Sequence, residues 1–208
     1  MPETVLLTRP KHDLTTSYLH YWTGKLIKEA EKKGIEVIDL EKEKATRENL
    51  ESYIDKKKPE ILVLNGHGSK DRIGGHKNRP VLEKGGNESK SANTAIYART
   101  CKSGADLAEA CVGSGAKAYI GYRKDFIVPY NTQKSTKPQR DSLAEPVMEA
   151  SNEAARNLIK GNKPKKAYRK SQEAYQEKIN KVLTTYQLGK DQLLAALLHN
   201  KENQVLEE

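Results

Sequence analysis

Five short runs of apolar residues punctuate the chain, each bounded by glycine, proline or charged residues. The runs are rich in β-branched or aromatic side chains and contain few polar positions. Continuous apolar runs of this kind are typical of strands that are covered on both faces, as in a parallel sheet. The pattern therefore predicts strands at residues 5–7, 35–38, 61–64, 95–98 and 118–120.

The segments between these runs carry apolar residues at spacings of three and four. Residues 15–33, 46–57 and 105–112 all show this spacing, and a glycine or proline follows each of them within two residues. Such periodicity with a stop signal is typical of amphipathic helices. Strands that alternate with single helices predict an α/β fold with a mostly parallel central sheet and right-handed crossovers.

The pattern changes after residue 138. Residues 139–161 and 164–187 have helical periodicity, and a shorter apolar helix is expected around residues 193–198. We therefore expect an α/β domain at residues 1–138. Residues 139–208 are expected to form a helical extension that packs on the same domain or supplies an oligomer face.

Composition excludes several classes of protein. The 208 residues include 37 Lys+Arg against 28 Asp+Glu, which gives a formal net charge of +9, and only two cysteines. The chain has no run of ~18 or more apolar residues and no secretory signal pattern at its start. We therefore expect a cytoplasmic protein without a membrane partner. Two cysteines do not make a disulfide framework, so both thiols are expected to be free.

Two long stretches, residues 69–93 and 123–138, lack a regular pattern and are rich in Gly, Lys, Ser, Asn or Pro. Connections longer than ~12–15 residues without structure of their own are usually functional or disordered. The first stretch carries an excess of basic residues, which favours simple solubility and, as the alternative, attraction of an acidic substrate or a nucleic acid. It contains no aromatic residue to stack on bases, so the sequence does not favour a nucleic-acid partner.

A histidine and a cysteine follow two of the predicted strands. The run 61–64 leads to His67, and the run 95–98 leads to Cys101 just ahead of a predicted helix. Ligands bind at the carboxyl ends of parallel strands, so the two side chains face one cleft if these strands are neighbours. We expect the helix N-terminus and nearby cations to lower the pKa of the Cys101 thiol. Cys111 lies on an apolar helical stripe and is expected to be core.

The segments around these residues resemble a known family. Residues 61–69 (ILVLNGHGS), 95–104 (AIYARTCKSG) and 115–122 (GAKAYIGY) are similar to the caspase-like cysteine peptidases, nearest in look to the CHAT-domain and gingipain-like branch. The resemblance covers about residues 4–126. It implies a caspase-like three-layer sandwich, here followed by C-terminal helices, and an endopeptidase that cleaves peptide bonds through an acyl-enzyme.

Carried over by position, the resemblance makes Cys101 the nucleophile and His67 the general base and acid. It makes the backbone N–H groups of Gly68 and Cys101 the donors of an oxyanion hole. The dyad of this family generally needs no third acid. In relatives, two loops build the pocket for the P1 side chain. An arginine there favours acidic side chains and an aspartate basic ones, and the sequence leaves both open because these loops hold Arg9, Asp13, Tyr122 and Asp125.

The partner implied by the resemblance is a protein or peptide substrate, with no cofactor. No metal site is expected, because a zinc site needs about four suitably spaced ligands, and two cysteines with scattered histidines do not supply them. Residues 123–138 lie where relatives often carry an activation loop, so self-cleavage there is a further hypothesis. A regulatory protein partner, or a second copy bound through the C-terminal helices, is a further expectation.

Two functions of other classes stay open beside the peptidase. One is a catalytically silent caspase-like module that assembles through its C-terminal helices. The other is a basic α/β protein that binds nucleic acid, which predicts an affinity that falls steeply with salt.

Overall fold

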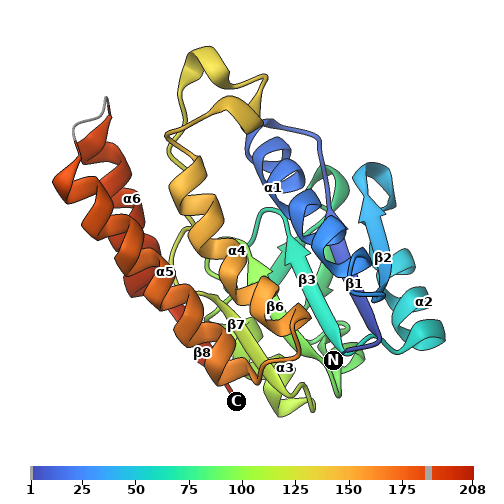
Figure 1. Cartoon of the computed structure of the whole chain (residues 1–208). Coiled ribbons are helices and arrows are strands. Elements are labelled where there is room, and N and C mark those ends of the chain that lie inside the picture. The colour runs from blue at the N-terminus through green and yellow to red at the C-terminus, as the bar shows by residue number, and fades with distance from the viewer. Residues whose placement is uncertain (1, 186–188) are drawn as a thin grey trace.

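The strands form a central sheet whose order differs from their order in the sequence (Figure 1). The computed structural model describes residues 2–185 and 189–208. The sheet order is β2-β1-β3-β6-β7-β8, in which β8 alone pairs antiparallel with its neighbour. The strands are β1 (Thr4–Arg9), β2 (Glu36–Glu41), β3 (Ile61–Asn65), β6 (Ala95–Arg99), β7 (Ala118–Tyr122) and β8 (Gln204–Glu207).

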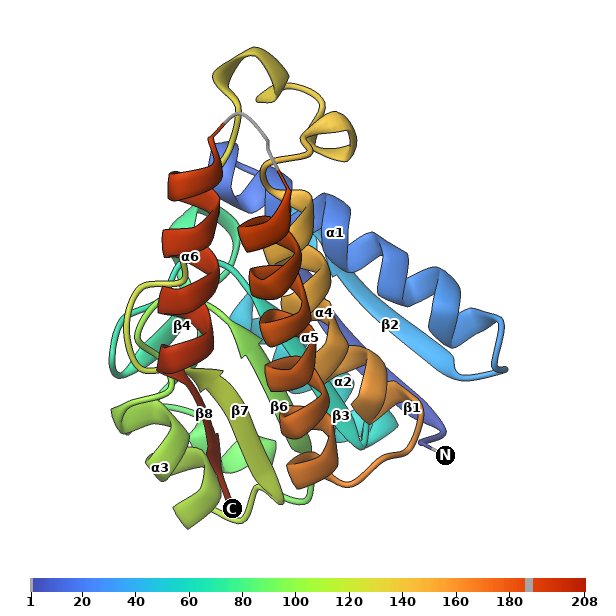
Figure 2. The ribbon, with the colours of Figure 1, turned by 60° about the vertical axis from the view of Figure 1, so that its left-hand side comes forward.

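Helices cover both faces of this sheet (Figure 2). Successive strand residues point to opposite faces, and they enter two separate apolar clusters. Leu7 and Val63 belong to the cluster under α1 (Leu14–Glu31), α4 (Glu145–Ile159), α5 (Pro164–Thr184) and α6 (Lys190–Asn203). Leu6 and Leu62 belong to the cluster under α2 (Arg47–Lys57) and α3 (Asp106–Gly113). The result is a three-layer α/β sandwich with a mostly parallel sheet.

The start of α1 is fixed by a capping box. The side chain of Asp13 accepts a hydrogen bond from the backbone N–H of Thr16, and the side chain of Thr16 accepts one from the backbone N–H of Asp13. Reciprocal bonds of this kind satisfy N–H groups that have no partner inside the helix. The cap therefore holds the Asp13 carboxylate at the carboxyl end of the sheet.

Residues 139–208 pack against the same sheet as residues 1–138. Helix α4 contacts β6, α5 contacts β7, and the chain returns from α6 into β8 beside β7 (Figure 2). The buried side-chain amide of Gln204 donates hydrogen bonds to the Tyr122 hydroxyl and to Ser171 Oγ, which connects β8 to β7 and α5. None of the described helices has the length and apolar character needed to span a membrane.

The strands and helices predicted from the sequence are confirmed in order and type. Strand β8 was not predicted. The expectation that residues 69–93 lack regular structure is wrong, because they contain an antiparallel hairpin of β4 (Arg72–Gly74) and β5 (Pro80–Glu83) and two short 3-10 turns. The helix predicted at 164–187 is α5, and residues 186 and 187 lie outside the described part of the chain.

Candidate active site

The two strands that lead to His67 and Cys101 are direct neighbours. Strands β3 and β6 pair in parallel with Asn65 opposite Arg99, so each candidate follows its strand by two residues at the same edge of the sheet. The loop backbones touch there, because a Cβ atom on Gly68 would lie 2.5 Å from the carbonyl oxygen of Cys101. A side chain at position 68 is therefore incompatible with this approach, and glycine permits it.

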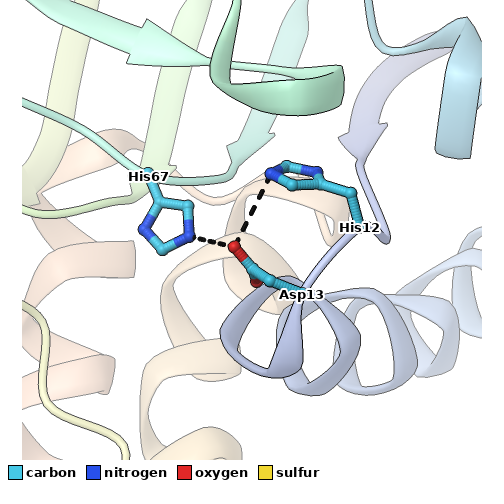
Figure 3. Close-up of side chains that lie close together, drawn as sticks. All are labelled: His12, Asp13 and His67. Carbon is cyan, nitrogen blue, oxygen red and sulfur yellow. Dashed lines mark hydrogen bonds and ion pairs between the residues drawn. The ribbon is translucent and has the colours of Figure 1, made fainter.

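A carboxylate orients the imidazole of His67. Its Nε2 atom lies 2.6 Å from Oδ2 of Asp13, the residue that caps α1 (Figure 3). Burial acts to raise the pKa of Asp13, but hydrogen bonds from the Thr16 backbone and from His67 outweigh it and hold the pKa below its ordinary value. The carboxylate is thus ionised at neutral pH and can only accept. Nε2 therefore carries the proton, which leaves Nδ1 of the neutral ring free as a base.

The thiol of Cys101 lies beside the segment that follows β7. Burial raises its pKa, and Asp125 acts in the same direction, whereas the backbone N–H of Phe126 and the charge of Lys102 act against it. This corrects the expectation of a lowered pKa. Helix α3 begins at Asp106, five residues after Cys101, so the cysteine is not its first residue.

The sheet order explains why these two side chains have different neighbours. Asp13 follows β1, which adjoins β3, and Asp125 follows β7, which adjoins β6. The imidazole is therefore held from one side of the site and the thiol from the opposite side. Over residues 2–185 and 189–208, no hydrogen bond joins the His67 ring to the thiol.

Two backbone donors at the junction of these loops are available to a ligand. The N–H groups of Gly68 and Cys101 donate no hydrogen bond to another group in the described residues. Gly68 pairs with Ile73 in an isolated antiparallel bridge. The hydrogen bonds of this bridge run from the Ser69 N–H to the Arg72 carbonyl and from the Gly74 N–H to the His67 carbonyl, so the Gly68 N–H takes no part in it. Both N–H groups belong to the two loops that touch at this edge of the sheet.

The remaining residues expected in a substrate pocket have other partners. Arg9 is buried, and its guanidinium contacts the Asp39 carboxylate and donates to the carbonyl oxygen of His20. Tyr122 is fully buried, with its hydroxyl 3.0 Å from that of Tyr175. Asp125 is exposed, and its carboxylate lies 3.3 Å from Lys102 Nζ, beside the cysteine loop.

Arg99 connects the strands that carry the site to two helices, a role that sequence reasoning missed. This fully buried guanidinium donates to Asn65 and Thr23, and also to Ser151 and Asn152 on α4. The ends of β3 and β6 are thereby tied to helices α1 and α4. The sequence did carry a signal for this role, because Arg99 is the one charged residue of β6 and comes at its end.

His12 is the second residue that sequence reasoning missed. Its ring centroid is 6.2 Å from that of His67, and its Nε2 lies 3.6 Å from Asp13 Oδ2 and 3.0 Å from Asn78 Oδ1. In the sequence it is one histidine of five, without a motif around it. Only the fold brings it to the end of β3.

Comparison with known proteins does not assign the chain to a family. No protein-family model matches the chain, and no curated protein matches its sequence.

Proposed function

We propose that the protein is a cysteine endopeptidase with a caspase-like fold, in which Cys101 is the nucleophile and His67 the general base. The observation that carries the proposal is the contact between the two loops that follow β3 and β6. The parallel pairing of these strands sets Gly68, the residue after His67, against the carbonyl oxygen of Cys101 and the side chain of Thr100. The three-layer α/β architecture and the motif order in the sequence support it.

In the proposed reaction, Nδ1 of His67 takes the proton of the Cys101 thiol, and the sulfur attacks the carbonyl carbon of a peptide bond. The N–H groups of Gly68 and Cys101 stabilise the oxyanion, a contribution of about 10²–10³ in rate for one such donor in other enzymes. His67 then gives its proton to the leaving amine as the C–N bond breaks. Water hydrolyses the thioester and releases the acid and the free thiol.

Asp13 has a positioning role in this scheme. Its carboxylate keeps the proton on Nε2 of His67 and stabilises the imidazolium formed during the reaction, as an aspartate does for the histidine of serine peptidases. The chain therefore has a carboxylate behind its histidine, although the resemblance implied that none was needed.

The resting arrangement implies an activation step. The thiol has a raised pKa and lies toward Asp125 and Phe126, while the imidazole is held by Asp13. Reaction requires the Cys101 side chain to turn toward Nδ1 of His67. We therefore propose that the described conformation is the resting one, and that substrate binding moves the segment after β7, within residues 123–138, and releases the thiol.

The test is digestion of a positional peptide library by the full chain. Cleavage should disappear in Cys101→Ala and in His67→Ala and persist in Cys111→Ala, the control, because Cys111 is fully buried in the core. Intact-mass measurement of the same samples detects self-cleavage within residues 123–138. Cleavage that persists in Cys101→Ala would overturn the assignment.

One observation favours a second candidate, a catalytically silent module of the same fold. A half-buried thiol with a raised pKa is what an inert cysteine shows. A peptide with an electrophilic end group separates the two functions, because it labels Cys101 of a peptidase and no residue of a silent module. Sedimentation of the same protein tests whether that module self-associates.

A further inference from the structure

Three side chains from two segments converge beside the proposed dyad. His12 and Asp13 lie in the loop between β1 and α1, and His67 lies in the loop after β3. Figure 3 shows a ring nitrogen of each histidine facing the same carboxylate oxygen of Asp13. One atom from each residue can be chosen so that all three lie within 4.8 Å of one another.

The donor set matches a metal ion of the zinc class. Two imidazoles and one carboxylate, with a further position left for water, are a common ligand set of open zinc sites. With metal–ligand distances of about 2.0–2.2 Å, tetrahedral ligand atoms stand roughly 3.3 Å apart. The 3.6 Å between His12 Nε2 and Asp13 Oδ2 already fits, and the 2.6 Å between His67 Nε2 and Asp13 Oδ2 needs to open by less than 1 Å.

The surroundings hold these donors in place. Oδ1 of Asp13 accepts from the backbone N–H of Thr16 at 2.8 Å, so Oδ2 stays directed at the histidines. The side chain of His12 is only 14% exposed. Asn78 Oδ1, at 3.0 Å from His12 Nε2, is a further oxygen donor at the edge of the group. Ligands ordered by their neighbours lose less freedom on binding an ion than free side chains do.

We propose that His12, Asp13 and His67 form a binding site for one zinc-class divalent metal ion, and that the bound ion switches the peptidase off. The switch rests on the proposed function and follows from the ring of His67. The ion occupies Nε2, so the single proton of the neutral ring moves to Nδ1. Nδ1 is then a donor and cannot take the proton of the Cys101 thiol.

The ligand set can be tested on the unmodified chain with Co²⁺ as a spectroscopic replacement for zinc. The expected result is visible d–d absorption that saturates at one ion per chain, without the near-ultraviolet charge-transfer band of a cobalt–thiolate bond. The spectrum should be unchanged in Cys101→Ala. A charge-transfer band that disappears in this variant would place the ion on the cysteine and overturn the proposal.

The affinity of Zn²⁺, measured by competition with a chromophoric chelator, tests the role of His12. His12→Ala should weaken binding by at least about 100-fold, because even the loss of an outer partner of a ligand costs roughly 10–100-fold. His20→Ala is the matched control, since His20 pairs with Glu41 at 2.9 Å in a His–carboxylate pair outside the group. Equal affinities for His12→Ala and the unmodified chain would overturn the site. Mg²⁺ should not bind, because it prefers oxygen ligands.

The inhibitory effect has its own readout. Each variant's peptide cleavage is compared with and without Zn²⁺, relative to its own metal-free rate. The unmodified chain should lose activity at the concentration at which zinc binds, and His12→Ala should need at least about 100-fold more zinc. Zinc binding without any peptidase activity would reject the proposed function and keep the site. Peptidase activity that zinc does not change would reject the switch.

Discussion

At the scale of single residues, the environment of Cys101 sets its reactivity. Only the thiolate reacts with alkylating agents, so burial and the nearby Asp125 carboxylate make the resting thiol slow at neutral pH. Lys102 and the Phe126 N–H reduce this effect without reversing it. The charge balance around the sulfur is therefore set mainly by the segment that follows β7.

The pH dependence of alkylation follows from these shifts. Labelling of Cys101 by iodoacetamide should increase about tenfold per pH unit through neutral pH and level off only above the ordinary pKa of a thiol. Cys111 should react more slowly at every pH, because burial raises the pKa of its thiol to about 11. Mass spectrometry of the labelled chain gives both rates. A Cys101 rate that is already level below about pH 7 would show a lowered pKa.

Asp125 offers a direct test of the same balance. Asp125→Asn removes the negative charge beside the thiol, so the pKa of Cys101 should fall and its labelling rate near pH 8 should increase several-fold. Asp55→Asn is the control, since Asp55 pairs with Lys90 at 2.7 Å and is not among the groups that shift the thiol pKa. Equal labelling rates for the two variants would contradict the role of Asp125.

Gly68 is the residue on which the contact between the loops depends. In Gly68→Ala the new Cβ would lie 2.5 Å from the Cys101 carbonyl oxygen and 2.9 Å from Thr100 Cβ. Relief of this overlap requires the loops to separate, at a cost of about 1–3 kcal/mol in the free energy of unfolding. The matched control is Gly113→Ala, where a Cβ meets nothing within 4 Å. Urea denaturation should show a loss in the first variant and none in the second.

At the scale of elements, Arg99 holds the strand ends on which the site is built. Among residues 2–185 and 189–208 its buried guanidinium has no carboxylate partner, and it is stabilised by hydroxyl and amide oxygens from β3, α1 and α4. Arg99→Met leaves the Asn65 and Asn152 side chains without this donor in the core. We expect the free energy of unfolding to fall by about 2–4 kcal/mol, because a buried acceptor left without its donor costs about 1–3 kcal/mol.

The control for this prediction is Arg123→Met, because Arg123 is exposed and its side chain makes no hydrogen bond among the described residues. An exposed substitution of this kind usually changes stability by less than about 0.5 kcal/mol. Urea denaturation measures both variants. A loss for Arg99→Met no larger than for Arg123→Met would show that the network contributes little.

The elements also show how far sequence reasoning reaches. The strands at 61–64 and 95–98 were predictable because both faces of a central parallel strand are buried, which makes the whole run apolar. Strand β8 was not predictable, because it has only four residues and one charged position, and follows α6 without a break. The hairpin of β4 and β5 was missed because its strands are short, and because one glycine and four polar residues separate them.

The candidate site was predictable to the same limited extent. The sequence predicted that the loops carrying His67 and Cys101 meet at one edge of the sheet if their strands are neighbours, and β3 and β6 do pair in parallel. The partners of each side chain could not be predicted, because they depend on the loops after β1 and β7. Asp13 was thus expected in a pocket and instead holds His67, and no pattern marked His12.

At the scale of the whole molecule, the last strand, β8, forms one edge of the sheet near the loop that carries Cys101. Strand β8 pairs with β7, and Val205 packs so tightly over Gly104 that a Cβ there would lie 2.7 Å from its side chain. Gly104 is three residues after Cys101. The last strand is therefore in contact with the segment that carries the proposed nucleophile.

Removal of residues 204–208 tests this coupling. The truncation leaves the edge of β7 unpaired and removes the hydrogen bonds of Gln204 to Tyr122 and Ser171. At about 1 kcal/mol of net stabilisation for each hydrogen bond lost, we expect the free energy of unfolding to fall by about 2–4 kcal/mol. Because Gly104 loses its cover, labelling of Cys101 should also become faster under native conditions. Glu208→Ala, an exposed change at the same end, should alter neither quantity. An unchanged labelling rate in the destabilised truncated chain would show that β8 stabilises the sheet without restraining the cysteine loop.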